Sequence, residues 1–185
     1  MTLPNILTLS RVALIPIVVL MLFADDPFMR WWAFGLFTLL SVTDYFDGYL
    51  ARALDQSSAL GALMDPIADK VLVAALTVAL VARGDIAGWD VAGAILILCR
   101  EFLVSGLREF LAQRDLPLPV TKLAKWKTTA QLVALALLIL APLATPDQLL
   151  GISGIWWVAT ALTLITGVDY VRSAARQLKP ATGGQ

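Results

Sequence analysis

Six stretches of about 20 mostly apolar residues follow one another along this 185-residue chain. An α-helix needs that length to cross the roughly 30 Å hydrocarbon core of a bilayer. Apolar residues make up 59% of the sequence and charged residues 15%, whereas soluble domains have about 45–50% and about 25%. Turn-forming residues separate the stretches and place the spans at 7–24, 31–52, 63–83, 86–111, 122–143 and 151–173. We therefore predict an all-α integral membrane protein, a bundle of six transmembrane helices, and allow a short interfacial helix at its N-terminus.

Lysine and arginine residues lie mainly on one side of these six spans. Of the 14 in the sequence, only Arg30 and Arg83 fall on the other side. The remaining 12 gather on the side that holds both chain ends: Arg11, Arg52, Lys70, Arg100, Arg108, Arg114, Lys122, Lys125, Lys127, Arg172, Arg176 and Lys179. Cytoplasmic segments carry this excess, so both termini are predicted to be cytoplasmic. Five tryptophans near the outer ends are expected to anchor in the lipid interface: Trp31, Trp32, Trp89, Trp156 and Trp157.

Composition excludes several classes of protein and of site. The formal net charge of zero argues against a nucleic-acid partner, which a basic imbalance normally accompanies. Cys99 is the single cysteine, so an intrachain disulfide is impossible. The sequence contains no histidine, so any metal site must be built from oxygen ligands.

The chain is expected to form one membrane domain over residues 1–176, followed by a disordered tail over 177–185 that is rich in glycine and polar residues. The N-terminus shows no pattern of a removable signal peptide or transit peptide. Together with the composition rich in alanine and leucine, this favours a bacterial cytoplasmic (inner) membrane.

Four aspartates interrupt the second and third predicted spans. Each is costly at membrane depth, roughly 2.5–3.5 kcal/mol by insertion scales. On helices, Asp44 and Asp47 share one face of the second span, and Asp65 and Asp69 share one face of the third. The short link between these spans makes them antiparallel neighbours, so the carboxylates are expected to converge just inside the cytoplasmic surface. The same faces carry three small residues, Gly48, Ala51 and Gly61, which leave a slot for a flat group.

A cluster of four carboxylates is best explained by a divalent metal ion. Oxygen ligands favour a hard cation such as Mg²⁺ or Mn²⁺. Structural ion pairing is one alternative, but Arg52 and Lys70 would neutralise only two of the four acids. A cation-conducting pathway is another alternative, because intramembrane acids often mark ion routes. Such a pathway would spread its acids over several spans and depths, which is not the pattern here.

The aspartates belong to a longer pattern, D-x2-D-G-x2-A-R-x8-G-x3-D-x3-D, which resembles the signature of the CDP-alcohol phosphotransferases. Every fixed position is present: Asp44, Asp47, Gly48, Ala51, Arg52, Gly61, Asp65 and Asp69. The resemblance implies a membrane enzyme that transfers a phosphatidyl or similar group from a CDP-linked donor to an alcohol and releases CMP. It also implies a six-helix bundle, and homodimers are typical of the family.

Three other segments, 3–11, 100–109 and 122–131, resemble the phosphatidylglycerophosphate synthases of that family. The resemblance, which runs from about residue 3 to 140, implies CDP-diacylglycerol as donor and sn-glycerol 3-phosphate as acceptor. Members that use another acceptor, such as inositol phosphate or phosphatidylglycerol, keep the aspartates, so those acceptors remain alternatives. A divalent-cation transporter remains an alternative of a different class.

The resemblance implies roles for individual residues. Asp44, Asp47 and Asp65 would hold one or two Mg²⁺ or Mn²⁺ ions, to which Asp69 adds a further contact. Asp69 would also act as general base on the acceptor hydroxyl. Gly48, Ala51, Arg52 and Gly61 would bind the nucleotide.

Basic residues of the fourth and fifth spans are candidates for the acceptor phosphate, namely Arg100, Arg108, Lys125 and Lys127. Arginine binds phosphate through two parallel hydrogen bonds, and lysine supplies a point charge. Arg100 and Arg108 are eight residues apart, so both are expected to face the bundle interior, where Glu101 or Glu109 would be the partner of Arg100. Contact with lipid headgroups is the alternative role of the lysines.

Overall fold

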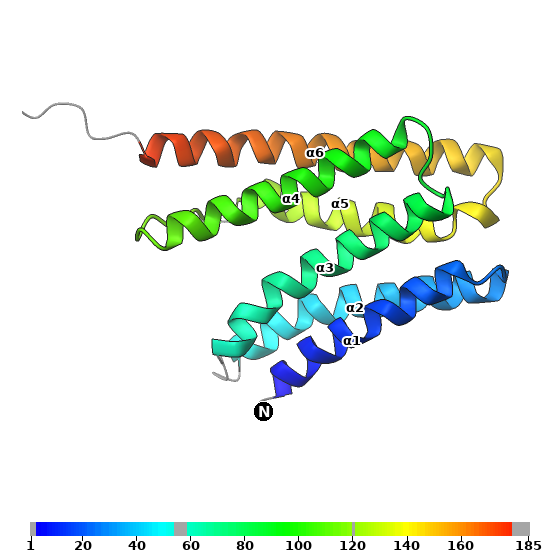
Figure 1. The fold of residues 1–185 in the computed structure, drawn as a ribbon, viewed down its shortest axis with the longest axis horizontal. Helices are drawn as coiled ribbons and strands as arrows, with labels where there is room; N and C mark the ends of the chain where they lie inside the picture. The colour runs from blue at the N-terminus through cyan, green and yellow to red at the C-terminus, as the bar shows by residue number, and fades with distance from the viewer. Residues whose placement is uncertain (1–2, 54–58, 120, 179–185) are drawn as a thin grey trace, which may run out of the picture.

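The computed structural model describes residues 3–53, 59–119 and 121–178, with side-chain surroundings for 9–43, 67–119 and 121–178. This part of the chain is all helix and loop (Figure 1). The elements are α1 (Leu3–Phe23), α2 (Pro27–Ala53), α3 (Ala59–Arg83), α4 (Asp90–Ala112), α5 (Lys122–Ile139), the 3-10 turn η1 (Ala141–Leu143) and α6 (Pro146–Leu178). The six predicted spans therefore correspond to six helices. α1 is continuous from Leu3, without a separate interfacial helix in the described residues.

The helices form two groups of three. α1 packs against α2 and α3, and α6 packs against α4 and α5. The groups meet where α5 contacts α2 and α3, and where α3 contacts α4 (Figure 1). Apolar side chains from both groups make the larger of two apolar clusters in the described residues, which includes Leu22, Leu76 and Ile97.

All six helices alternate in direction, so their ends gather at two poles of the molecule (Figure 1). At one pole α1, α3 and α5 begin, and α2, α4 and α6 end; we call it the motif end, because the aspartate segments lie there. The other pole is the opposite end. This alternation is what the predicted topology requires.

The helix boundaries follow from local chemistry. Pro27 starts α2 directly after Asp26, whose carboxylate accepts a hydrogen bond from the backbone N–H of Phe28 at 2.9 Å. Thr121 caps α5, since its hydroxyl accepts a hydrogen bond from the N–H of Ala124 at 3.2 Å. α3 ends at Arg83 and is followed by Gly84, whose φ of 79° is the left-handed conformation that glycine adopts without strain.

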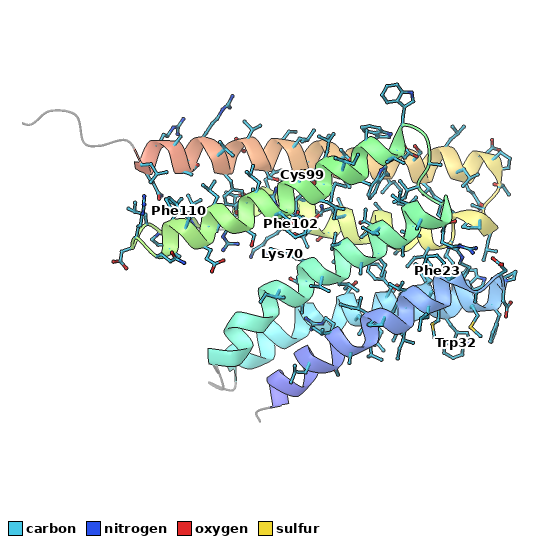
Figure 2. The ribbon with its side chains drawn as sticks, viewed as in Figure 1. Phe23, Trp32, Lys70, Cys99, Phe102 and Phe110 are labelled. Atoms are coloured by element: carbon cyan, nitrogen blue, oxygen red, sulfur yellow. The ribbon has the colours of Figure 1, made fainter. Side chains whose placement is uncertain are left out.

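Large apolar side chains cover the outer faces of the helices. Trp32 is 56% exposed and Phe102 60% exposed, and both point away from the bundle (Figure 2). Within the described part of the chain, α6 is the one helix that is long and apolar enough to cross a membrane by length and composition. α4 and α5 carry several charged residues toward the motif end, and these residues interrupt the apolar stretches of the two helices.

Trp156 is not a lipid anchor, and here the prediction was wrong. Its side chain is fully buried between α4 and α6, and its indole N–H donates to the backbone oxygen of Asp90 at 3.0 Å. Gly93 makes this packing possible, because a Cβ there would lie 2.7 Å from Trp156 Nε1. The position of a tryptophan near a helix end does not show whether its side chain faces lipid or a neighbouring helix.

α6 continues to Leu178, two residues into the tail that was expected to be disordered. Residues 179–185 lie outside the described part of the chain.

A buried ion pair joins α2 to the loop after α3 at the opposite end. Arg30 of α2 donates to both carboxylate oxygens of Asp85, at 2.6 and 3.3 Å, and the two side chains are 4% and 7% exposed. Arg83 pairs with Asp25 at 2.9 Å, but that carboxylate is 87% exposed. The two basic residues on the predicted outer side are therefore each neutralised by an acid.

These two pairs predict different sensitivities to mutation. Arg30→Met leaves the Asp85 carboxylate buried without its cation and should lower the free energy of unfolding by about 3–5 kcal/mol. Arg83→Met is the matched control and should cost less than about 1 kcal/mol, because water solvates Asp25. Denaturant titration of both variants in detergent micelles measures this difference. Equal losses in the two variants would contradict it.

Candidate functional site

The aspartate pattern lies on helical backbone throughout its described length. α2 continues through Asp44 and Asp47 to Ala53, and α3 begins before Asp65. The helical spacing on which the shared faces depend is therefore confirmed. The convergence of the four carboxylates stays a prediction, because the side chains of Asp44, Asp47 and Asp65 lie outside the described residues.

The predicted nucleotide-binding residues also lie outside the residues whose side chains are described. They are Gly48, Ala51, Arg52 and Gly61. Among the described side chains, no group of three or more potential metal ligands occurs. The donor set of the pattern consists of carboxylates, which fits a hard divalent cation.

Asp69 is the one aspartate of the pattern whose side chain is described. It is exposed on α3. α3 contacts α5, the helix that carries Lys127. The candidate general base is thus exposed on a helix that packs against the helix of a candidate phosphate-binding residue.

A buried polar cluster joins α4, α5 and α6 in the half of the bundle toward the motif end. Its centre is Glu101, whose Oε1 accepts hydrogen bonds from Arg100 Nη1 at 3.1 Å, Lys127 Nζ at 2.5 Å and Gln131 Nε2 at 3.4 Å. Arg100 and Lys127 are 8% and 4% exposed. Buried charges require such partners, since an unpaired one costs several kcal/mol. The cluster contains two cations and one anion, so it carries a net positive charge.

α6 completes the surroundings of Arg100. Arg100 Nη2 donates to the hydroxyl of Thr166 at 3.1 Å, and the guanidinium lies over the ring of Tyr170, 5.6 Å from the ring centroid. The Nε atom is buried and has no hydrogen-bond partner among the described residues. Gly167 lets the arginine approach, because a Cβ there would lie 2.9 Å from Arg100 Cγ. One N–H of a buried guanidinium therefore lacks an acceptor among the described residues.

The structure separates the four residues predicted for the acceptor phosphate. Arg100 and Lys127 both pair with Glu101, so these two cations lie close enough to bind one anion together. Arg108 is exposed, so the prediction that it faces the interior was wrong. Lys125 is exposed as well. The eight-residue spacing allows Arg100 and Arg108 to share a face of α4, but it does not bury Arg108 with Arg100.

Several members of the cluster were not among the predicted site residues. Glu101 was considered only as a partner of Arg100, and it is that partner in place of Glu109. Gln131, Thr166 and Tyr170 were missed. A signal for α6 existed in the sequence, since Thr163, Thr166 and Tyr170 are polar residues at helical spacing in an otherwise apolar segment.

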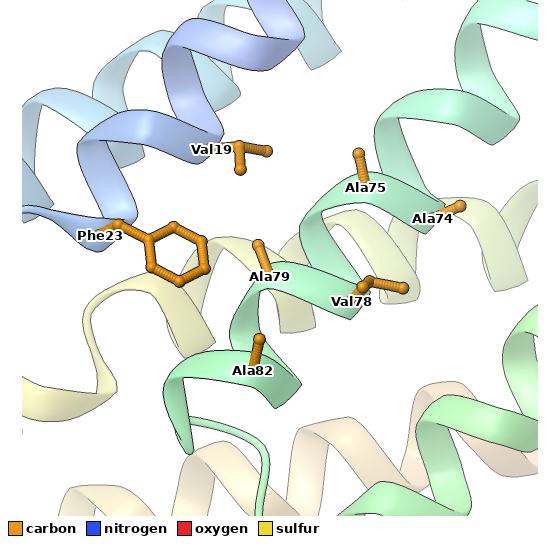
Figure 3. A pocket seen from close by; sticks show the side chains of 7 residues that line it. All are labelled: Val19, Phe23, Ala74, Ala75, Val78, Ala79 and Ala82. Atoms are coloured by element: carbon orange, nitrogen blue, oxygen red, sulfur yellow. The ribbon is translucent and has the colours of Figure 1, made fainter.

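An apolar cavity lies between α1 and α3 near the opposite end (Figure 3). Its volume is about 390 Å³, and it is lined by Val19, Phe23, Ala74, Ala75, Val78, Ala79 and Ala82. These side chains offer no ligand for a metal ion or a phosphate. This cavity therefore contributes no polar group to the candidate site.

Comparison with known proteins identifies similar sequences over almost the whole chain. Residues 1–168 match the family described as CDP-alcohol phosphatidyltransferase. A protein of Rickettsia bellii named CDP-diacylglycerol–glycerol-3-phosphate 3-phosphatidyltransferase is 43% identical, over 94% of this chain and 96% of its own length. Proteins with the same name from Cereibacter sphaeroides and Pseudomonas fluorescens are 41% and 38% identical, over 96% and 97% of this chain and 97% and 93% of their own lengths.

The close approach of Gly167 to Arg100 predicts a specific effect of a methyl group. Gly167→Ala should push the arginine stem out of place and lower the free energy of unfolding by about 1–3 kcal/mol, since the buried side chain has little room to move. Gly154→Ala on the same helix meets no atom within 4 Å and should be neutral or stabilising by up to about 1 kcal/mol. Denaturant titration in detergent compares the two. A neutral Gly167→Ala would show that Arg100 is not tightly held.

Proposed function

Because the chain belongs to the CDP-alcohol phosphatidyltransferase family, we propose that it transfers the phosphatidyl group of CDP-diacylglycerol to sn-glycerol 3-phosphate. The products are phosphatidylglycerophosphate and CMP, as the names of the relatives imply for those proteins. One observation carries the acceptor assignment. Arg100 and Lys127 form a buried site with excess positive charge on α4 and α5, and α5 contacts α3, which carries Asp69, the last residue of the aspartate pattern.

The excess charge matches the acceptor, because glycerol 3-phosphate is a dianion. Arg100 offers its unpaired Nε–H and Lys127 its ammonium to phosphate oxygens, in a site from which water is largely excluded. Binding the phosphate there would leave the 1-hydroxyl of the acceptor free to approach Asp69. The carboxylate of Asp69 then takes the hydroxyl proton as the oxygen attacks the phosphorus of the lipid and CMP leaves.

Asp44, Asp47 and Asp65, with Asp69 one turn further, are the residues proposed to hold Mg²⁺ or Mn²⁺. A divalent ion bound there would neutralise the pyrophosphate of the donor and the charge that develops on CMP. Gly48, Ala51, Arg52 and Gly61 are proposed to receive the cytidine nucleotide, because small residues let it lie against helix backbone. Arg108 and Lys125, which are exposed, are proposed to attract the anionic substrates rather than to enclose them.

The same proposal includes the membrane arrangement. All six helices span the bilayer, both termini are cytoplasmic, and the motif end faces the cytoplasm of a bacterium. Residues 1–176 then act as one membrane domain. The alternating helix directions and the exposed apolar side chains of α4, such as Phe102 and Phe110, support this arrangement (Figure 2). Two copies are proposed to associate through α3 and α4.

Release of CMP tests the reaction and the acceptor together. Purified protein in detergent, given CDP-diacylglycerol and Mg²⁺ or Mn²⁺, should release CMP when glycerol 3-phosphate is added. Inositol phosphate and phosphatidylglycerol should give little signal, and excess chelator should abolish the reaction. CMP release with a different acceptor only would overturn the acceptor assignment. Metal flux into proteoliposomes without any CMP would favour a transporter.

The proposed base predicts a separation of binding from turnover. Asp69→Asn should lower kcat by about 10²–10⁴-fold, because the amide cannot take the hydroxyl proton, whereas binding of CDP-diacylglycerol should survive. Asp115→Asn removes the same charge from the exposed loop after α4 and should leave both unchanged. Turnover measured as CMP release and binding measured by equilibrium titration separate the two effects. Near-normal turnover of Asp69→Asn would exclude the base role.

A further inference from the structure

Glu101 occupies a position that neither the aspartate pattern nor the acceptor-binding residues explain. One of its two carboxylate oxygens, Oε1, accepts hydrogen bonds from two helices. The donors are Arg100 on α4 and both Lys127 and Gln131 on α5. The side chain is 16% exposed. Without this carboxylate, two positive charges would share a buried site and repel each other. Glu101 therefore decides where the guanidinium and the ammonium lie.

The arrangement differs from a simple structural ion pair. A pair of one acid and one base would be neutral, whereas this cluster retains one excess positive charge. Other groups already restrain Arg100, since Thr166 accepts a hydrogen bond from Nη2 and Tyr170 lies against the guanidinium. Nε still points to no partner among the described residues. The cluster is thus held rigidly and is incomplete in its hydrogen bonding, which is the condition of a preorganised anion site.

We propose that Glu101 is a positioning residue for the acceptor phosphate. It holds Arg100 and Lys127 together where α4 packs against α5 and α6, and it leaves one net positive charge for the incoming dianion. This inference rests on the proposed function, because it assigns the phosphate of the acceptor to these two cations. Both side chains are long, so fixing them before binding saves conformational entropy that the phosphate would otherwise have to offset.

The closing experiment compares Glu101→Gln with Glu109→Gln in the full-length protein. Glutamine keeps the shape of Glu101 but loses its charge. Glu109 lies two turns further along α4 and is exposed, so its variant is a matched control. Glu101→Gln should raise KM for glycerol 3-phosphate about 10- to 100-fold, the effect of losing hydrogen bonds between charged groups. KM for CDP-diacylglycerol and kcat should change little. An interaction that binds the acceptor equally in the ground state and the transition state affects only KM for that acceptor.

Lys127→Met shows whether Glu101 acts through the lysine. If it does, adding Glu101→Gln to Lys127→Met should raise KM for glycerol 3-phosphate by much less than it does in the wild-type background. Full additivity would overturn the proposal. The proposal would also be overturned if Glu101→Gln and Glu109→Gln had the same KM for glycerol 3-phosphate. An equal rise in KM for both substrates in Glu101→Gln would overturn it as well.

Glu101→Asp is a second variant that tests the positioning role if Glu101→Gln does not fold. The shorter carboxylate retains the charge but cannot reach all three donors, so KM for glycerol 3-phosphate should lie between those of the wild type and Glu101→Gln. A wild-type KM for Glu101→Asp would contradict positioning. Wild-type protein that releases no CMP with glycerol 3-phosphate would instead contradict the proposed acceptor, so the two failures are distinguishable.

Discussion

The high cost of burying an uncompensated charge governs the arrangement of this helical bundle. Two cations in the described interior each have an acid partner on another element. Arg30 of α2 meets Asp85 of the loop after α3, and Lys127 of α5 meets Glu101 of α4. These pairs connect helices that apolar packing alone would leave free to slide. They therefore fix both the register of the helices and the position of the polar chemistry.

The two poles of the molecule use this constraint differently. At the opposite end the arginines are each matched by one acid, and the cavity between α1 and α3 is wholly apolar. Toward the motif end the buried cluster keeps a surplus positive charge. A surplus is costly for folding and useful for binding an anion, because a bound phosphate supplies the missing negative charge. The cations of the opposite end are thus neutralised by acids, whereas the buried cluster keeps a surplus cation that we propose to bind an anionic substrate.

Much of the architecture follows from the sequence. Apolar stretches and turn residues predicted six helices within a few residues of their observed bounds, since helix length and hydropathy are local properties. Local periodicity was insufficient to orient single side chains. Arg100 is interior and Arg108 is exposed, although one helix carries both at compatible spacing. Trp156 faces α4 rather than lipid, because Gly93 opens a place for its ring.

By itself the sequence determined the aspartate pattern, the helical faces that carry it and the family to which the chain belongs, because spacing along a helix sets these features. Only the tertiary structure decided which cations become neighbours. Glu101 joins Lys127 across 26 positions, and Arg100 reaches Thr166 across 66. Such contacts depend on how α4, α5 and α6 pack, and no periodicity within one helix encodes the rotation of its neighbour. The aspartates locate the reaction, and helix packing selects the cations that we propose to receive the acceptor.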